Sequence, residues 1–305
     1  MKQIGKNRQL LENGELLPLL MIFPALVVVA FVQVIPIGYG LFISLLNYNF
    51  GQIDLSKDFV GLANYFRMVK DPLVWRGIRV ALTFTVMAIS GDMLFGTIIA
   101  LALHHMNFTL SKILRPLVTI PLLISPIIIG LIWRYMLDPL SGFFYWVISL
   151  VGLGIEHFPG LTSPSTALLC VAMAHWWQVS PFVIIVISAG LASIPSEYYE
   201  AARIDGARFF QTFFRITLPH LSHLYMVLII IAGVDTIKVF DIIVSLTMGG
   251  PNNATLSITY YAFRKAFIIP EMGYAMAISV FSMVISFLVF GIPFSRFNQK
   301  KAAEY

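Results

Sequence analysis

The longest stretches of this chain without a charged residue are long enough to cross a membrane as helices. Asp, Glu, Lys and Arg are absent from residues 16–46, 116–133, 157–196 and 272–295. An α-helix rises about 1.5 Å per residue, so about 20 apolar residues cross the roughly 30 Å of hydrocarbon in a bilayer. These runs therefore predict four membrane-spanning helices.

Two further spans are predicted where a few charges interrupt an apolar run. Residues 80–103 contain only Asp92. Residues 216–246 contain three charged residues, namely Asp235, Lys238 and Asp241. With these two runs included, the sequence predicts an all-α, polytopic transmembrane bundle of six spans.

The composition agrees with this class and excludes others. The chain is 58% hydrophobic and 11% charged, whereas soluble proteins have about 25% charged residues. The only cysteine, Cys170, has no partner for a disulfide within the chain. The net charge of +5 fits basic residues that border membrane helices, without a nucleic-acid partner. The predicted organisation is an N-terminal segment 1–15, a transmembrane domain 16–295 and a tail 296–305.

The distribution of Lys and Arg predicts the orientation. The glycine-interrupted run 139–155 leaves the number of crossings open, and we expect it to lie at the outer interface rather than to cross. With six spans, eleven basic residues then fall on one side and seven on the other. The positive-inside rule places both termini and the loop 193–219 in the cytoplasm.

The loop 193–219 carries the most specific pattern in the chain. Ser196 after Pro195 is a suitable N-cap, and Gly206 can adopt the left-handed conformation that ends a helix. In the next segment Arg208, Gln211 and Arg215 recur at the spacing of one helix face. The sequence therefore predicts a helix, a turn and a short amphipathic element held against the membrane surface.

Seven residues of this loop match a known signature, E-A-A, three residues, G, nine residues, I-x-L-P. They are Glu200, Ala201, Ala202, Gly206, Ile216, Leu218 and Pro219. The chain therefore resembles the binding-protein-dependent ABC importer permeases. Weaker landmarks are similar to the sugar branch of that family, which includes the maltose and glycerol-3-phosphate permease subunits; they include Gly61-Leu62-Ala63-Asn64-Tyr65, Pro181-Phe182 and Met248-Gly249-Gly250-Pro251.

The resemblance implies a passive, multi-pass permease subunit of the bacterial inner membrane with the type I ABC importer fold. In such a protein the loop forms a coupling helix that docks on a separate ATPase, and here the contact residues would be Glu200, Ala201, Ala202, Asp205 and Gly206. ATP and Mg²⁺ would bind to an ATPase dimer, and this chain would hold no cofactor and would not be an enzyme. The other implied partners are a second, homologous permease chain in a heterodimer and an extracytoplasmic solute-binding protein.

Charged residues inside predicted spans require an explanation, because each costs about 2.5–3.5 kcal/mol at a helix centre. One interpretation is an internal ion pair of Lys238 with Asp235 or Asp241. The other is a translocation pathway whose polar and aromatic groups bind the hydroxyls of a sugar-like solute. The candidates for that pathway are Asp92, Trp176, Trp177, Gln178, Asp235, Lys238, Asp241, Tyr260 and Tyr261. Trp and Tyr also anchor helices at membrane interfaces.

Two other classes of membrane protein are alternatives, an ion-coupled transporter and a membrane-embedded enzyme. An ion-coupled secondary transporter could use Asp92, Asp235 and Asp241 as proton or sodium sites, but it leaves the loop signature unexplained. A membrane-embedded enzyme would need a catalytic or metal-binding constellation, and none is found. In particular, the adjacent His104 and His105 point about 100° apart on a helix and are read as surface residues, not as metal ligands.

Overall fold

The computed structural model describes residues 17–51, 54, 58–150, 152 and 158–291. The predicted segments 1–15 and 296–305 lie outside the described residues. Within these ranges the chain is helical and has no β-strand, apart from an isolated bridge between Leu46 and Phe59.

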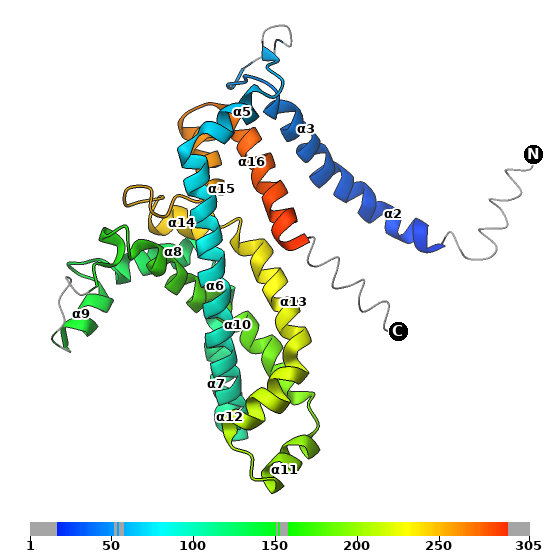
Figure 1. The fold of residues 1–305 in the computed structure, drawn as a ribbon, viewed down its shortest axis with the longest axis vertical. Coiled ribbons are helices and arrows are strands. Elements are labelled where there is room, and N and C mark those ends of the chain that lie inside the picture. Colours follow the sequence, from blue (N-terminus) through cyan, green and yellow to red (C-terminus); the bar gives the residue numbers. More distant parts are fainter. Residues whose placement is uncertain (1–16, 52–53, 55–57, 151, 153–157, 292–305) are drawn as a thin grey trace, which may run out of the picture.

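Among the described residues, five helices are long and apolar enough to span a membrane (Figure 1). They are the α2–η1–α3 helix (Leu17–Val29, Ala30–Val34, Ile35–Ser44), α6 (Pro72–His105), α10 (Ala167–Ala192), the α12–η4–α13 helix (Phe209–Thr212, Phe213–Thr217, Leu218–Thr236) and the α16–η6 helix (Met272–Ser286, Phe287–Gly291). In Figure 1, α6 runs along most of the molecule, α10 and α13 accompany its lower half, and α16 lies beside α3 at the upper end.

The predicted span 116–133 is not one continuous helix. The structure places α7 (Phe108–Thr119) and η2 (Ile120–Leu123) before a break, and α8 (Pro126–Met136) leaves the break at 100°. Pro121 and Pro126 have no N–H to donate to a preceding helical turn, which favours a break between them. Counted as one span, this bent pair completes six, so the prediction of a six-span helical bundle is confirmed.

The predicted limits of the span 216–246 are also wrong. Helical structure begins at Phe209, so the segment expected to lie apart on the membrane surface is continuous with the span. The helix ends at Thr236, and after four residues α14 (Asp241–Leu246) begins. Asp235, Lys238 and Asp241 therefore do not share one helix.

Shorter helices connect the spans. They are α5 (Ala63–Lys70), α9 (Phe143–Leu150), η3 (Gly160–Thr162), α11 (Ser196–Ile204), α15 (Ile258–Phe263) and η5 (Arg264–Ile268). The eight residues of α9 are only about 12 Å long, too short to cross a bilayer. Part of the run 139–155, including residues 151 and 153–155, lies outside the described residues.

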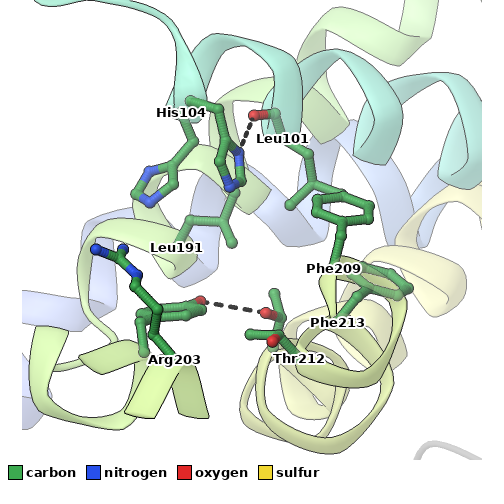
Figure 2. A pocket seen from close by; sticks show the side chains of 10 residues that line it. Leu101, His104, Leu191, Arg203, Phe209, Thr212 and Phe213 are labelled. Carbon is green, nitrogen blue, oxygen red and sulfur yellow. Dashed lines mark hydrogen bonds between the residues drawn. The ribbon is translucent and has the colours of Figure 1, made fainter. Parts of the chain in front are cut away.

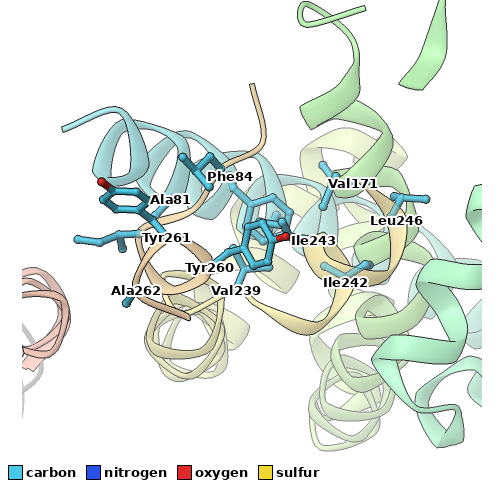
Figure 3. Close-up of a cluster of buried hydrophobic side chains, with 14 of the residues drawn as sticks. Ala81, Phe84, Val171, Val239, Ile242, Ile243, Leu246, Tyr260, Tyr261 and Ala262 are labelled. Atoms are coloured by element: carbon cyan, nitrogen blue, oxygen red, sulfur yellow. The ribbon is translucent and has the colours of Figure 1, made fainter. Parts of the chain in front are cut away.

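The main core lies where α6, α10, α14 and α15 meet (Figure 3). Phe84 and Ile243 are fully buried there. The largest contact between two helices joins α6 and α10, and Gly91 and Gly96 of α6 permit it: a Cβ at Gly91 would lie 2.1 Å from the Trp176 ring, and one at Gly96 would lie 2.5 Å from Val183. By contrast, residues 21–39 of the first spanning helix are exposed in the single chain.

Candidate functional site

The signature loop forms a helix that ends in a Schellman motif. In α11, the Ala207 N–H donates to the Ala202 carbonyl at 2.9 Å and the Gly206 N–H to the Arg203 carbonyl at 3.2 Å. This pattern requires a left-handed residue just after the helix, and Gly206 has φ +72°. The predicted turn at Gly206 is therefore present. The predicted N-cap is one residue off, because Pro195 is the cap and Ser196 is already helical.

The base of α13 holds α11 in place and leaves its outer face free. The Tyr199 hydroxyl lies 3.2 Å from the Thr217 hydroxyl, and the Tyr198 ring lies 5.0 Å from the His220 ring. Ala202 is buried. The exposed residues of α11 and its turn include Glu200, Ala201, Arg203, Ile204, Asp205 and Gly206.

Ile204 is the least expected member of this face. Its side chain is 87% exposed at the end of α11, although nothing in the signature fixes the residue type there. An apolar side chain presented in this way beside carboxylates is suited to contact with another protein.

A cavity of about 310 Å³ with both polar and apolar lining residues lies beside the break that follows α13. It brings together four of the predicted pathway residues, Gln178, Asp235, Lys238 and Asp241, with His175 and Phe84. Gln178 donates to the Ile124 carbonyl at 3.0 Å, which satisfies a backbone group at the break before α8. Its side-chain oxygen remains available to the cavity.

Lys238 makes no ion pair with Asp235 or Asp241 in the part of the chain that the structure describes. All three side chains are exposed at the break. Lys238 also lines a second cavity of about 270 Å³, together with Thr259, Ser279, Ser282 and Ser286. These three serines are spaced i, i+3 and i+7, so they lie on one face of α16. The pattern is visible in the sequence, but a search for charged residues does not detect it.

Asp92 is fully buried and pairs with a residue that the sequence analysis left unassigned. Its Oδ2 lies 3.1 Å from His175 Nε2, and its Oδ1 has no hydrogen-bond partner among the described residues. The His175 ring also packs edge-on against Phe84, with centroids 5.4 Å apart. His175 lines the cavity and Asp92 does not. Asp92 is therefore linked to the cavity only by its contact with His175.

The two tryptophans lie away from this cavity. The Trp176 indole N–H donates to the Met87 carbonyl at 2.9 Å, in the contact between α6 and α10. Trp177 is 41% exposed, and its ring lies 6.3 Å from that of Trp133. A role for either residue in a pathway stays a prediction.

Tyr260 and Tyr261 belong to the buried core (Figure 3). Tyr260 stacks on Phe263. The Tyr261 hydroxyl donates to Asp71 Oδ2 at 2.7 Å, and the Tyr274 hydroxyl donates to the same oxygen at 2.7 Å. Asp71 thus fastens α15 and α16 to the start of α6, a structural arrangement that the sequence did not indicate.

An ionic cluster adjoins this arrangement. Glu271 accepts hydrogen bonds from Arg67 and Lys265, each at 2.9 Å, and the Arg67 guanidinium lies 4.2 Å from the centre of the Tyr274 ring. Burial opposes ionisation of Glu271, but these two cations outweigh it and hold the pKa of the carboxyl below its usual value. For Asp71, burial is likewise outweighed by the hydrogen bonds from Tyr261, Tyr274 and the Leu73 N–H, so its pKa is also lowered.

These lowered pKa values predict acid sensitivity. A carboxyl with a depressed pKa stabilises the fold above its unfolded pKa, about 4 for Asp and Glu, and loses that contribution as the pH falls further. We expect the thermal unfolding midpoint of the solubilised protein to fall between about pH 5 and pH 3, and Asp71→Asn with Glu271→Gln to flatten that fall. The control Glu197→Gln, on exposed α11, should keep it. An equal slope in all three proteins would contradict the assignment.

No three His, Cys, Asp or Glu side chains in the described ranges are grouped so that they could hold a metal ion. What the described residues do provide is a bundle of candidate spanning helices, a cavity with charged lining residues at a helix break and an exposed helix at one end. These features are the ones expected of a membrane transport subunit.

Comparison with known proteins agrees with this class. The model for the family "Binding-protein-dependent transport system inner membrane component" matches residues 92–299. The chain is 34% identical to the trehalose/maltose transport system permease protein MalF of Thermococcus litoralis, over 92% of this chain and 94% of that protein. It is 29% identical to the sn-glycerol-3-phosphate transport system permease protein UgpA of Agrobacterium fabrum, over 94% and 96%. The chain therefore belongs to the family of binding-protein-dependent transport system inner membrane components.

Solved structures give the same fold. A chain in the crystal structure of a bacterial ABC transporter involved in the import of the acidic polysaccharide alginate matches with a TM-score of 0.79 at 22% identity, over 97% of this chain and 99% of that one. The predicted ABC importer permease fold is confirmed, as is the resemblance to permeases of the sugar branch.

Proposed function

We propose that this chain is the permease subunit of an ATP-driven importer for a sugar or sugar-like solute. The observation that carries the proposal is the exposed face of α11, a helix that ends at Gly206 and presents Glu200 and Ile204 at one end of the bundle. In this account α11 is the coupling helix that docks on a separate ATPase dimer, which binds ATP and Mg²⁺. Both termini and α11 lie in the cytoplasm.

The exposed first span supports a second permease chain. Residues 21–39 present mostly apolar side chains that no other described residue covers, and a contiguous apolar surface of this kind suits lipid or a helical partner. A heterodimer with a homologous chain would give each subunit half of the pathway. Docking of an extracytoplasmic solute-binding protein is supported by a related structure, 22% identical, described as a complex with an alginate pentasaccharide-bound periplasmic protein.

The cavity at the break supports the location of the pathway. Carboxylate and amide oxygens accept hydrogen bonds from sugar hydroxyls, and Lys238 donates to sugar oxygens. Asp235, Asp241 and Gln178 supply the acceptors. Membership of a binding-protein-dependent family argues against an ion-coupled transporter, because such a transporter needs neither a binding protein nor an ATPase.

Substitution in the cavity should separate transport from assembly. Asp235→Asn and Lys238→Met should each lower solute uptake into proteoliposomes by about tenfold, the worth of one or two hydrogen bonds to the solute. Assembly with the ATPase should be unchanged, because neither side chain is part of a buried ion pair. Lys70→Met, which removes an exposed lysine on α5, is the control and should transport normally. Loss of folded protein in the two cavity variants would point instead to a structural ion pair, whose rupture costs about 3–5 kcal/mol.

A further inference from the structure

We propose that a third cavity, bordered by α11, the segment 209–217 and the ends of α6 and α10, binds the phosphate group of an anionic ligand. The cavity has a volume of about 260 Å³, against about 30 Å³ for one water in the liquid. It is separate from the cavity at the helix break, and its lining includes His104 and His105, which the sequence analysis treated as surface residues.

Positive and hydrogen-bond-donating groups converge on this cavity from two elements. His104 and His105 end α6, and Arg203 extends from α11 toward His104 (Figure 2). No carboxylate lines the cavity. In the described ranges the Arg203 guanidinium has neither an ion pair nor a hydrogen bond, so its N–H donors are open to solvent or to a ligand.

The hydrogen bonds already formed leave donors for a ligand. His105 Nδ1 lies 2.8 Å from the Leu101 carbonyl, which can only accept, so Nδ1 carries the proton of the neutral ring and Nε2 can only accept. The imidazole donor for a ligand is therefore His104, which also lines the cavity. Tyr199 and Thr217 share one hydrogen bond at 3.2 Å, and whichever hydroxyl accepts keeps its own proton free to donate. A guanidinium, an imidazole and a hydroxyl together suit the acceptor-only oxygens of a phosphate.

The hydrogen-bonding groups that line this cavity suit a neutral sugar less well than a phosphate. A sugar hydroxyl donates as well as accepts, and the lining residues include no carboxylate and no side-chain amide. Thr212 already donates its hydroxyl proton to the Arg208 carbonyl at 3.2 Å. The opposite wall is apolar, formed by Phe209 and Phe213 (Figure 2), so the ligand has room for an apolar part beside the phosphate.

Phosphate chemistry of this kind has two possible sources, an anionic phospholipid headgroup and a soluble phosphate ester. A ligand from either source would touch the end of α6 and α11 together and so restrain α11. The consequence for coupling rests on the proposed function, whereas binding itself does not.

The test measures binding to the full chain in its purified complex. Native mass spectrometry compares retention of phosphatidylglycerol with that of zwitterionic phosphatidylcholine, and calorimetry compares glucose 6-phosphate with glucose. Arg203→Gln should weaken binding of the retained anionic probe by about tenfold, as expected for loss of one charged hydrogen-bonding partner. Arg208→Gln removes the same charge from the same loop but outside the cavity, and it should change binding by less than about twofold.

Preference for phosphatidylglycerol would assign the site to lipid, and preference for glucose 6-phosphate would assign it to a soluble ester; either supports a phosphate site. The proposal is overturned if neither anionic probe binds more tightly than its analogue, or if Arg208→Gln weakens binding as much as Arg203→Gln. Because Arg203 is exposed, its variant should match the wild-type elution volume. If it does not, His104→Gln provides the same test from α6.

Discussion

Replacing Gly206 with Val should abolish the stimulation of ATP hydrolysis by solute, whereas replacing it with Asn should preserve it. Gly206 has φ +72°, and a Cβ built there meets nothing within 4 Å. Steric crowding therefore plays no part, and only backbone conformation distinguishes the two variants. Asn adopts left-handed geometry readily, while a β-branched residue is strongly disfavoured there.

A penalty of about 1–2 kcal/mol or more at this residue would displace the Schellman turn and redirect α11. We expect solute-stimulated hydrolysis by the reconstituted complex to fall about tenfold or more in Gly206→Val and to stay within about twofold of wild type in Gly206→Asn. Assembly of the complex is measured in parallel. Full stimulated hydrolysis and uptake in the Val variant would show that α11 is not the coupling helix.

Replacing Gly91 with Ala should destabilise the bundle. The added methyl group would lie 2.1 Å from the Trp176 ring, which the hydrogen bond to the Met87 carbonyl holds in place. Alanine improves helix propensity by up to about 1 kcal/mol, but forcing apart a packed helix pair typically costs about 1–3 kcal/mol. We expect the cost of this contact to lie toward the upper end of that range, because the Trp176 indole is held in place and cannot easily move aside.

The measurement is the fraction of detergent-solubilised protein that elutes as folded complex, together with its unfolding midpoint. Gly40→Ala in α3 is the matched control, since its added methyl group would lie 3.7 Å from the Met276 sulfur, an ordinary van der Waals contact, and it should be at least as stable as wild type. If Gly91→Ala matches that control, Trp176 does not pack between α6 and α10 as described.

Runs of apolar residues predicted where the spans lie because bilayer thickness sets a length that composition reveals directly. They did not reveal where a span breaks. The break before α8 left a signal in Pro121 and Pro126, whereas the break at residues 237–240 contains neither Pro nor Gly. That second break depends on tertiary packing, and it separates Asp235 from Asp241.

The turn that ends α11 and the Asp92–His175 pair beside the cavity also differ in whether the sequence could predict them. The turn at Gly206 was predictable because a left-handed residue is a local requirement of the backbone. The pairing of Asp92 with His175 joins residues 83 positions apart, and no local pattern encodes it. For Tyr261, the residue type suggested a sugar-binding group. In the structure its ring is part of the core and its hydroxyl donates to Asp71.

The most direct test of the central claim is solute uptake into proteoliposomes that contain this chain with the proposed partner permease and ATPase, and with the solute-binding protein added on the side opposite α11. The account predicts that uptake requires ATP on the side of α11 and continues when ionophores collapse the proton and sodium gradients. Uptake that proceeds without ATP and stops when those gradients are collapsed would contradict it.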